Sequence, residues 1–304
     1  MRLASPFRAA SRLPDPSPDF TALVTGASSG IGMEFARALG RRGHSLTLVA
    51  RRQERLLALA AEISGEHGVH VDCLAADLSV AAERDGLHAQ VLARGRGVQM
   101  LVNCAGFGIY EPFAASERER ELEQVRLLVD AVVDLDARYL PAMVERGRGA
   151  VINIASTAGF QPLPGNGTYS ASKAFVLAHT EALAEELRGR GVVVTAVCPG
   201  PVPTEFFEVG QPLVVHRIPR LFWCDSTRVA EDGLRAAARG APSIVPGSVL
   251  TRLFYAPYRT APRPIAAPIA RWLMAGELAR SGERNEPAPA SSEHPREAVE
   301  AKVP

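Results

Sequence analysis

Tyr169 and Lys173 stand four residues apart in the segment YSASK, so a helix would place both side chains on one face. A free tyrosine has a pKa of about 10, and a neighbouring ammonium would lower it. Such a phenol can give a proton to a developing alkoxide or take one from an alcohol. Lys173 is one of two lysines in the chain, the other being Lys302, whereas every other basic residue is arginine. The pair also fits an aromatic ring that packs beside a lysine stem.

Ser156 lies thirteen residues before Tyr169, at the end of an apolar run. Its hydroxyl could bind a substrate oxygen and hold it within reach of the phenol. Ser156, Tyr169 and Lys173 are therefore the predicted catalytic residues, for the interconversion of a carbonyl and an alcohol by hydride transfer. Taken alone, a serine at this position is more often a turn or helix-cap residue.

A glycine-rich segment, TGASSGIG at 25–32, lies between a predicted strand and a predicted helix. Glycines allow the backbone to turn tightly and to approach a pyrophosphate, which the N–H groups of the following helix would bind. Alone, the segment would fit any tight turn. The predicted cofactor contacts here are Gly26, Ser28, Ser29, Gly30, Ile31 and Gly32.

The second predicted strand ends in Arg51 and Arg52, where a site for NAD would place an acidic residue on the ribose 2′-hydroxyl. An arginine fork suits a 2′-phosphate, so NADP(H) is favoured over NAD(H), with Arg51 as the predicted contact. Both arginines also fit a solvated helix start. Asp77 and Leu78, after the third strand, are placed to meet the adenine, although Asp77 could merely cap the next helix.

Seven short apolar runs alternate with helical patterns along the chain. Runs without polar alternation are typical of strands buried on both faces, and hence of a parallel sheet covered by helices. The predicted fold class is α/β, a single Rossmann-type domain with a doubly wound parallel sheet whose ligands bind at the carboxyl ends of the strands. The expected strands cover residues 20–24, 45–50, 69–74, 98–103, 150–155, 192–198 and 243–245.

The composition sets further limits. The chain has 304 residues, 47% hydrophobic and 22% charged, with a net charge of +1, so it carries no global basic field for nucleic acid. Its four cysteines form no CxxC pair, which favours reduced thiols and a cytoplasmic location. No spacing of histidines or cysteines suggests a metal site. No run of 18 apolar residues predicts a transmembrane segment.

Four segments are expected. Residues 1–18 form a flexible tail, although their arginines also fit a transit peptide, and residues 19–247 form the catalytic domain. Residues 248–279 are apolar and rich in proline and arginine, which leaves open a lid, a dimer contact or a patch that touches a membrane surface. Residues 280–304 have a disordered composition.

The motifs together resemble the short-chain dehydrogenase/reductase family over about residues 20–245. They are TGASSGIG at 25–32, NCAG at 103–106, Ser156, YSASK at 169–173 and PGPVPT at 199–204. The resemblance implies a nicotinamide cofactor, a Ser–Tyr–Lys site and a homo-oligomer formed through the helices around 119–143 and 169–188. It also implies cofactor contacts from Asn103, Ala105, Gly106, Tyr169, Lys173, Pro199, Gly200, Val202 and Thr204.

Two residues depart from the family pattern. Cys104 replaces an asparagine of the NNAG motif. Leu128 stands where many members carry an asparagine that anchors a water in the proton relay, and a leucine side chain cannot hold that water.

The loop after Thr204 is apolar, which favours an apolar, lipid-like or steroid-like substrate, although the same side chains could simply pack down as a lid. Phe107 and Phe206, with Ser156 and Tyr169, are the predicted substrate contacts. The alternative function is a family-like nucleotide-binding protein with weak or no catalysis. A sugar-nucleotide epimerase is disfavoured because little chain remains for a second domain.

Overall fold

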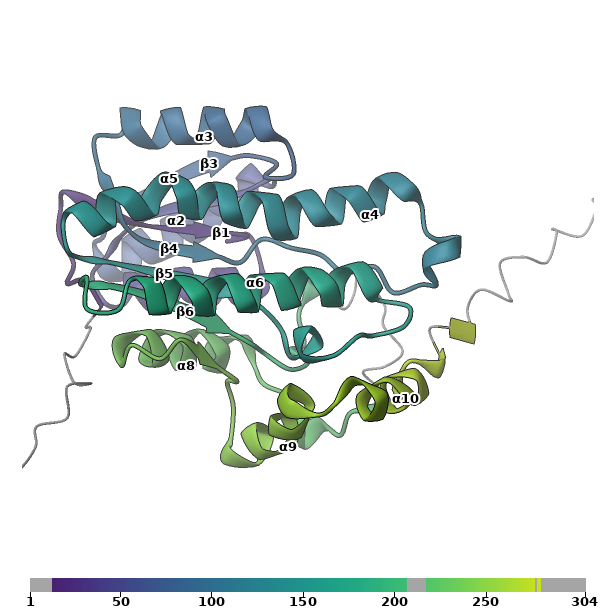
Figure 1. Ribbon diagram of the computed structural model, residues 1–304. Helices are drawn as coiled ribbons and strands as arrows, with labels where there is room; N and C mark the ends of the chain where they lie inside the picture. Colours follow the sequence, from purple (N-terminus) through teal and green to yellow (C-terminus); the bar gives the residue numbers. More distant parts are fainter. Residues whose placement is uncertain (1–12, 207–216, 277, 280–304) are drawn as a thin grey trace, which may run out of the picture.

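A seven-stranded parallel sheet forms the centre of the protein in a computed structural model, which describes residues 13–206, 217–276 and 278–279 (Figure 1). The strand order is β3-β2-β1-β4-β5-β6-β7, and every neighbouring pair is parallel. This order confirms the predicted doubly wound Rossmann-type sheet. The strands are β1 (Phe20–Thr25), β2 (Ser45–Ala50), β3 (Val71–Ala75), β4 (Gly97–Asn103), β5 (Gly149–Ile154), β6 (Val192–Val197) and β7 (Ser243–Ile244).

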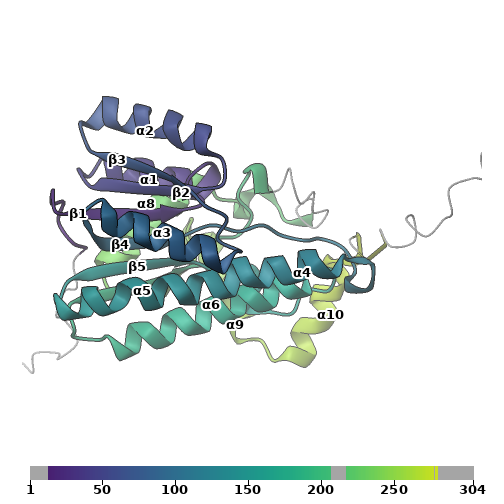
Figure 2. The ribbon, with the colours of Figure 1, turned by 90° about the horizontal axis from the view of Figure 1, so that it is seen from above.

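Helices cover both faces of the sheet, as Figure 2 shows from above. One face is packed by side chains such as Phe35, Leu56 and Val229, and the other by residues that include Leu87 and Leu135. Two apolar layers therefore enclose the strands, which explains why the strand sequences lack polar alternation. On the first face lie α1 (Gly30–Gly40), α2 (Gln53–His67) and α8 (Ser226–Ala238), and on the second α3 (Ala81–Ala93), α4 (Arg118–Val125), α5 (Ala131–Glu145) and α6 (Gly167–Glu186).

A π-helical segment, Arg126–Asp130, joins α4 to α5 within the long helix expected over 116–145. A π segment adds one residue to a helical turn and is frequent at functional sites. Leu128 lies within it and is buried.

The ordered domain begins earlier than predicted. Leu13 packs against the core, Pro14 is buried, and Asp15 forms an ion pair with Arg148. The expected tail over 1–18 was therefore too long, because residues 13–18 lie against the domain; residues 1–12 lie outside the described residues, as does the predicted tail 280–304.

The segment predicted as an extension contains two helices, α9 (Val249–Thr260) and α10 (Arg263–Leu273). Short 3₁₀ turns occur at η1 (Phe113–Ala115), η3 (Thr157–Phe160) and η5 (Arg220–Phe222). No helix in the described part of the chain is both long and apolar enough to cross a bilayer.

Candidate active site

One cavity of about 470 Å³ opens at the carboxyl ends of the strands and collects nearly all the predicted site residues. Ser156, Tyr169 and Lys173 lie on its wall, with Phe107 and Phe206. The predicted cofactor residues that line it are Gly26, Ser28, Ser29, Gly30, Ile31, Gly32, Arg51, Asp77, Leu78, Ala105, Gly106, Pro199, Gly200, Val202 and Thr204.

The glycine-rich turn forms a close backbone cradle. Gly26 has a φ of +66°, and a Cβ there would lie 2.9 Å from the backbone of Ala105. A Cβ on Gly32 would lie 2.4 Å from the carbonyl oxygen of Gly26. Ser29 precedes α1 without a side-chain cap, so the first N–H groups of the helix are open to an anion. This geometry fits the pyrophosphate of a dinucleotide.

Asn103 is the exception among the predicted cofactor contacts, because it does not line the cavity. Its Nδ2 donates to Oδ1 of Asp136 at 2.9 Å and to Oδ1 of Asn153 at 2.8 Å. All three side chains are buried. The direct cofactor contact is therefore not seen, and Asn103 braces β4 against β5 and α5.

The two arginines after β2 differ in their contacts. Arg52 donates to the hydroxyl oxygens of Ser28 at 3.0 Å and Ser29 at 3.2 Å, in the glycine-rich turn. Arg51 lies 3.6 Å from a carboxylate oxygen of Asp77. Sequence reasoning selected only Arg51, and the structure adds Arg52 as the guanidinium nearer the turn. The signal was its adjacent position.

Asp77 caps the turn before α3 as well as lining the cavity. Its Oδ1 accepts hydrogen bonds from the backbone N–H of Ser79 at 2.9 Å and from the Ser79 hydroxyl at 2.7 Å. The capping alternative is thus satisfied, and the side chain still faces the cavity beside Arg51.

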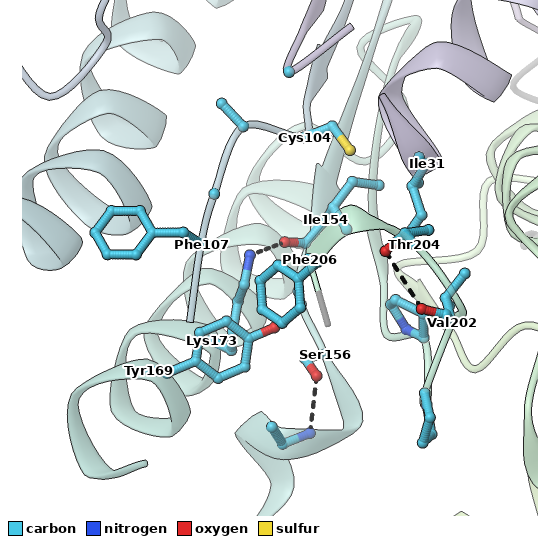
Figure 3. A pocket seen from close by; sticks show the side chains of 18 of the residues that line it. Ile31, Cys104, Phe107, Ile154, Ser156, Tyr169, Lys173, Val202, Thr204 and Phe206 are labelled. Carbon is cyan, nitrogen blue, oxygen red and sulfur yellow. Dashed lines mark hydrogen bonds between the residues drawn. The ribbon is translucent and has the colours of Figure 1, made fainter. Parts of the chain in front are cut away.

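The three predicted catalytic side chains lie together at the middle of the cavity wall (Figure 3). Tyr169 and Lys173 occupy successive turns of α6, and the Lys173 Nζ lies 5.8 Å from the centre of the tyrosine ring. Lys173 donates to the carbonyl oxygen of Ile154 at 2.6 Å, which fixes its ammonium at the end of β5. The Ser156 Oγ accepts from the N–H of Ala158 at 3.1 Å, so it also caps η3.

Burial dominates the ionisation of the two titratable groups. Burial raises the pKa of Tyr169 to about 12, while the hydrogen bond from Ser156 acts in the opposite direction. Burial lowers the pKa of Lys173 to about 8. The sequence predicted a tyrosine pKa lowered by Lys173; this direction is wrong for the protein without cofactor, because loss of solvation outweighs the ammonium, whose Nζ is held at the Ile154 carbonyl.

Aromatic side chains form the other half of the cavity. The Phe206 ring lies 5.6 Å from that of Tyr169 and 6.3 Å, edge-on, from that of Tyr110. Figure 3 shows the Phe107 ring turned away from Tyr169, although the residue lines the same cavity. The apolar loop predicted to cover the substrate falls partly on 207–216, which lie outside the described residues.

Helices α9 and α10 complete this wall, which sequence analysis did not predict. The additional lining residues are Phe254, Tyr255, Tyr258, Leu273 and Met274. The alternation of aromatic and small residues in FYAPY was the available signal, but nothing in the sequence places that segment over the cavity.

Leu128 packs against the motif NCAG. A Cβ on Gly106 would lie 2.7 Å from Leu128 Cδ2, so the leucine side chain fills the space beside this glycine. The π segment is present although the asparagine of many family members is not.

Comparison with known proteins identifies the family. The model of the short chain dehydrogenase family matches residues 20–211, more than half of the chain. The chain belongs to the short-chain dehydrogenase family. It is an oxidoreductase of this family, which confirms the predicted enzyme class.

Two curated relatives illustrate the similarity. The chain is 36% identical over 236 residues to a putative ketoacyl reductase of Streptomyces coelicolor, which covers 77% of this chain and 88% of that protein. It is 35% identical over 205 residues to the very-long-chain 3-oxoacyl-CoA reductase of Phaeosphaeria nodorum, covering 66% of this chain. The chain spans only 60% of the length of that second relative.

A solved structure extends the likeness beyond the family motifs. The short-chain dehydrogenase from Sphingobium yanoikuyae, in complex with NADPH, has a TM-score of 0.69 and 32% sequence identity. The match covers 90% of this chain and 98% of that one. It therefore includes chain beyond the 20–211 family match.

Proposed function

We propose that this enzyme uses NADPH to reduce the ketone of an apolar 3-oxoacyl thioester, with Tyr169 as the proton donor. The observation that carries the proposal is one continuous cavity, in which a dinucleotide cradle and an aromatic wall meet at Ser156, Tyr169 and Lys173. The names of the ketoacyl and 3-oxoacyl-CoA reductases among its relatives support the substrate class.

The cofactor half of the cavity fits NADP(H). The turn at Gly26 and the open N-terminus of α1 would hold the pyrophosphate, and Arg51 and Arg52 offer donors for a 2′-phosphate. The prediction of NADP(H) over NAD(H) agrees with the NADPH held by the Sphingobium protein. When bound, the reduced nicotinamide supplies the hydride.

The side chains then handle the oxygen that receives the negative charge. The Ser156 Oγ accepts from Ala158, which leaves its own proton free to donate to the substrate carbonyl. Tyr169 is protonated at neutral pH because its pKa lies near 12, so it can give its proton to the developing alkoxide. Lys173, fixed by Ile154, places a positive charge beside the phenol and stabilises the tyrosinate left behind.

The aromatic wall favours an acyl chain over a polar substrate. Phe206 and Tyr110 enclose the ring of Tyr169, and α9 and α10 add apolar side chains. The alternative, a nucleotide-binding protein with weak or no catalysis, would not require three polar groups gathered beside this wall.

The substrate assignment is tested by NADPH oxidation with 3-oxoacyl thioesters of increasing acyl length, beside small water-soluble ketones. We expect kcat/KM to rise with acyl length, because each buried methylene contributes about 0.8 kcal/mol. Turnover of small ketones alone would retain the reductase and remove the acyl substrate. NADPH binding with no turnover of any carbonyl would favour the alternative.

The rate of carbonyl reduction should depend on the ionisation of Lys173. Its pKa is lowered to about 8, so the ammonium is present below that pH and is lost above it. We therefore expect kcat for reduction to fall as pH rises through about 8, measured as a pH profile at saturating substrate. In Lys173→Arg, whose guanidinium does not lose its proton, the residual activity should lack this decline. A wild-type profile that stays flat through this region would contradict the role.

Restoring the family asparagine at Leu128 should change the rate and the stability in opposite directions. We expect Leu128→Asn to raise kcat several-fold by admitting a water to the proton relay, and to lower the free energy of unfolding by about 1–3 kcal/mol through the buried amide. Leu128→Met is the apolar control. An unchanged kcat in Leu128→Asn would mean that the leucine costs no activity.

We also infer a homo-oligomer formed through α5 and α6. Val133 and Phe175 are exposed on these helices, and Phe175 stacks on His179 at 5.7 Å. Light scattering should give a multiple of the chain mass, and Phe175→Asp should shift it toward the monomer. A monomeric wild type at micromolar concentration would contradict this inference.

A further inference from the structure

Seven large apolar side chains are exposed on α9, α10 and the neighbouring turn η5. They are more than half of the thirteen exposed large hydrophobic residues in the described part of the chain. Val249 is 70% exposed, Leu253 64% and Trp272 66%. The others are Leu221, Leu250, Ile265 and Ile269.

Their spacing makes both helices two-sided. In α9, Leu250 and Leu253 are exposed while Thr251 and Tyr255 are buried. In α10, residues 265, 269 and 272 are exposed at one-turn intervals, and 266 and 270 are buried. Each helix therefore packs one side on the protein and presents an apolar row to its surroundings.

The charge of this region has one sign. Residues 248–276 contain four arginines and no acidic residue. Arg252 and Arg259 reach acidic partners in the body of the protein, Asp232 and Glu181. Arg271, on α10, is exposed and has no acidic partner within ion-pair distance among the described residues, and the same holds for Arg220 beside the exposed Leu221.

The inner side of the same helices belongs to the active-site cavity. Tyr255, Tyr258 and Met274 line it from α9 and from the end of α10. Figures 1 and 2 show α10 beyond the end of the sheet where the strands terminate. A surface that bound the outer apolar rows would thus lie next to the wall of the cavity.

We propose that α9, α10 and η5 dock the enzyme on a lipid bilayer that carries anionic headgroups. Apolar side chains beside arginines match the boundary between acyl chains and negatively charged headgroups, where tryptophan is also favoured. A two-fold contact between copies of this chain would instead bring arginines against arginines, since residues 248–276 supply no acid. The proposal does not depend on the substrate assignment.

The test is co-sedimentation of the full chain with vesicles of phosphatidylcholine alone or mixed with phosphatidylserine. We expect binding to the mixed vesicles that weakens as salt rises. Arg271→Glu should weaken it by about fivefold or more, since each surface cation contributes about 1 kcal/mol near an anionic membrane. Leu253→Asp and Ile269→Asp should weaken it at least as much by placing charges in the apolar rows.

Leu92→Asp is the matched control, because Leu92 is 65% exposed on α3, outside the proposed surface. It should bind vesicles as the wild type does. All four variants should keep wild-type NADPH oxidation with a water-soluble ketone. Absence of wild-type binding, or equal loss in Leu92→Asp, would overturn the proposal. So would a lipid-free dimer that dissociates in Leu253→Asp, since that outcome would assign the surface to a second copy.

Discussion

Replacing Tyr169 by phenylalanine is expected to lower kcat for carbonyl reduction by about 10²–10⁴-fold, the usual contribution of a positioned general acid. The ring and its packing against Phe206 are retained, and only the hydroxyl is removed. Binding of NADPH, followed by the change in its fluorescence, should stay close to that of the wild type. The large loss would then belong to the proton transfer and not to the fold.

Tyr110→Phe is the matched control, because it removes a second phenol from the same cavity, 6.5 Å from Tyr169 between ring centres. Its kcat should remain within a few-fold of the wild type. Substantial activity in Tyr169→Phe, or an equal loss in Tyr110→Phe, would place the proton donor elsewhere.

Replacing Arg52 by aspartate should change the choice of cofactor. The guanidinium lies at the phosphate-binding turn, where a hydrogen bond to a charged group contributes about 1.5–3 kcal/mol. We expect kcat/KM for NADPH to fall by about 10–150-fold, with a smaller fall or a gain for NADH, since a carboxylate can accept from a ribose 2′-hydroxyl. The ratio of the two kcat/KM values is the measurement.

Two further variants separate the causes. Arg51→Asp should have the smaller effect, because Arg51 contacts Asp77 and not the turn. Arg52 also pairs with Glu205 at 2.9 Å, so Glu205→Gln checks whether losing that ion pair alone alters the ratio. If Arg52→Asp left the preference for NADPH unchanged, neither the turn nor Arg52 would select the phosphate.

The fold and most of the site could be predicted because their signals are local. Strands buried on both faces lack polar alternation, and the turn at Gly26 requires a positive φ with no room for a side chain. Tyr169 and Lys173 share a helix, so their spacing alone places them together.

Other features depend on contacts that no local pattern encodes. The tyrosine pKa was predicted in the wrong direction because burial, a property of the whole fold, outweighs the nearby ammonium. Asn103 looked like a cofactor residue, but hydrogen bonds to Asp136 and Asn153 turn its side chain into the protein. The place of α9 and α10 over the cavity follows from packing between segments distant in sequence.

A crystal structure with NADP⁺ and a bound 3-oxoacyl or 3-hydroxyacyl thioester tests the central claim most directly. The hydroxyl oxygens of Tyr169 and Ser156 should each lie within about 3.2 Å of the substrate oxygen at C3. The hydrogen-bearing face of the nicotinamide C4 should face that carbon. A substrate oxygen bound by other groups, with the tyrosine hydroxyl beyond hydrogen-bond distance, would contradict the account.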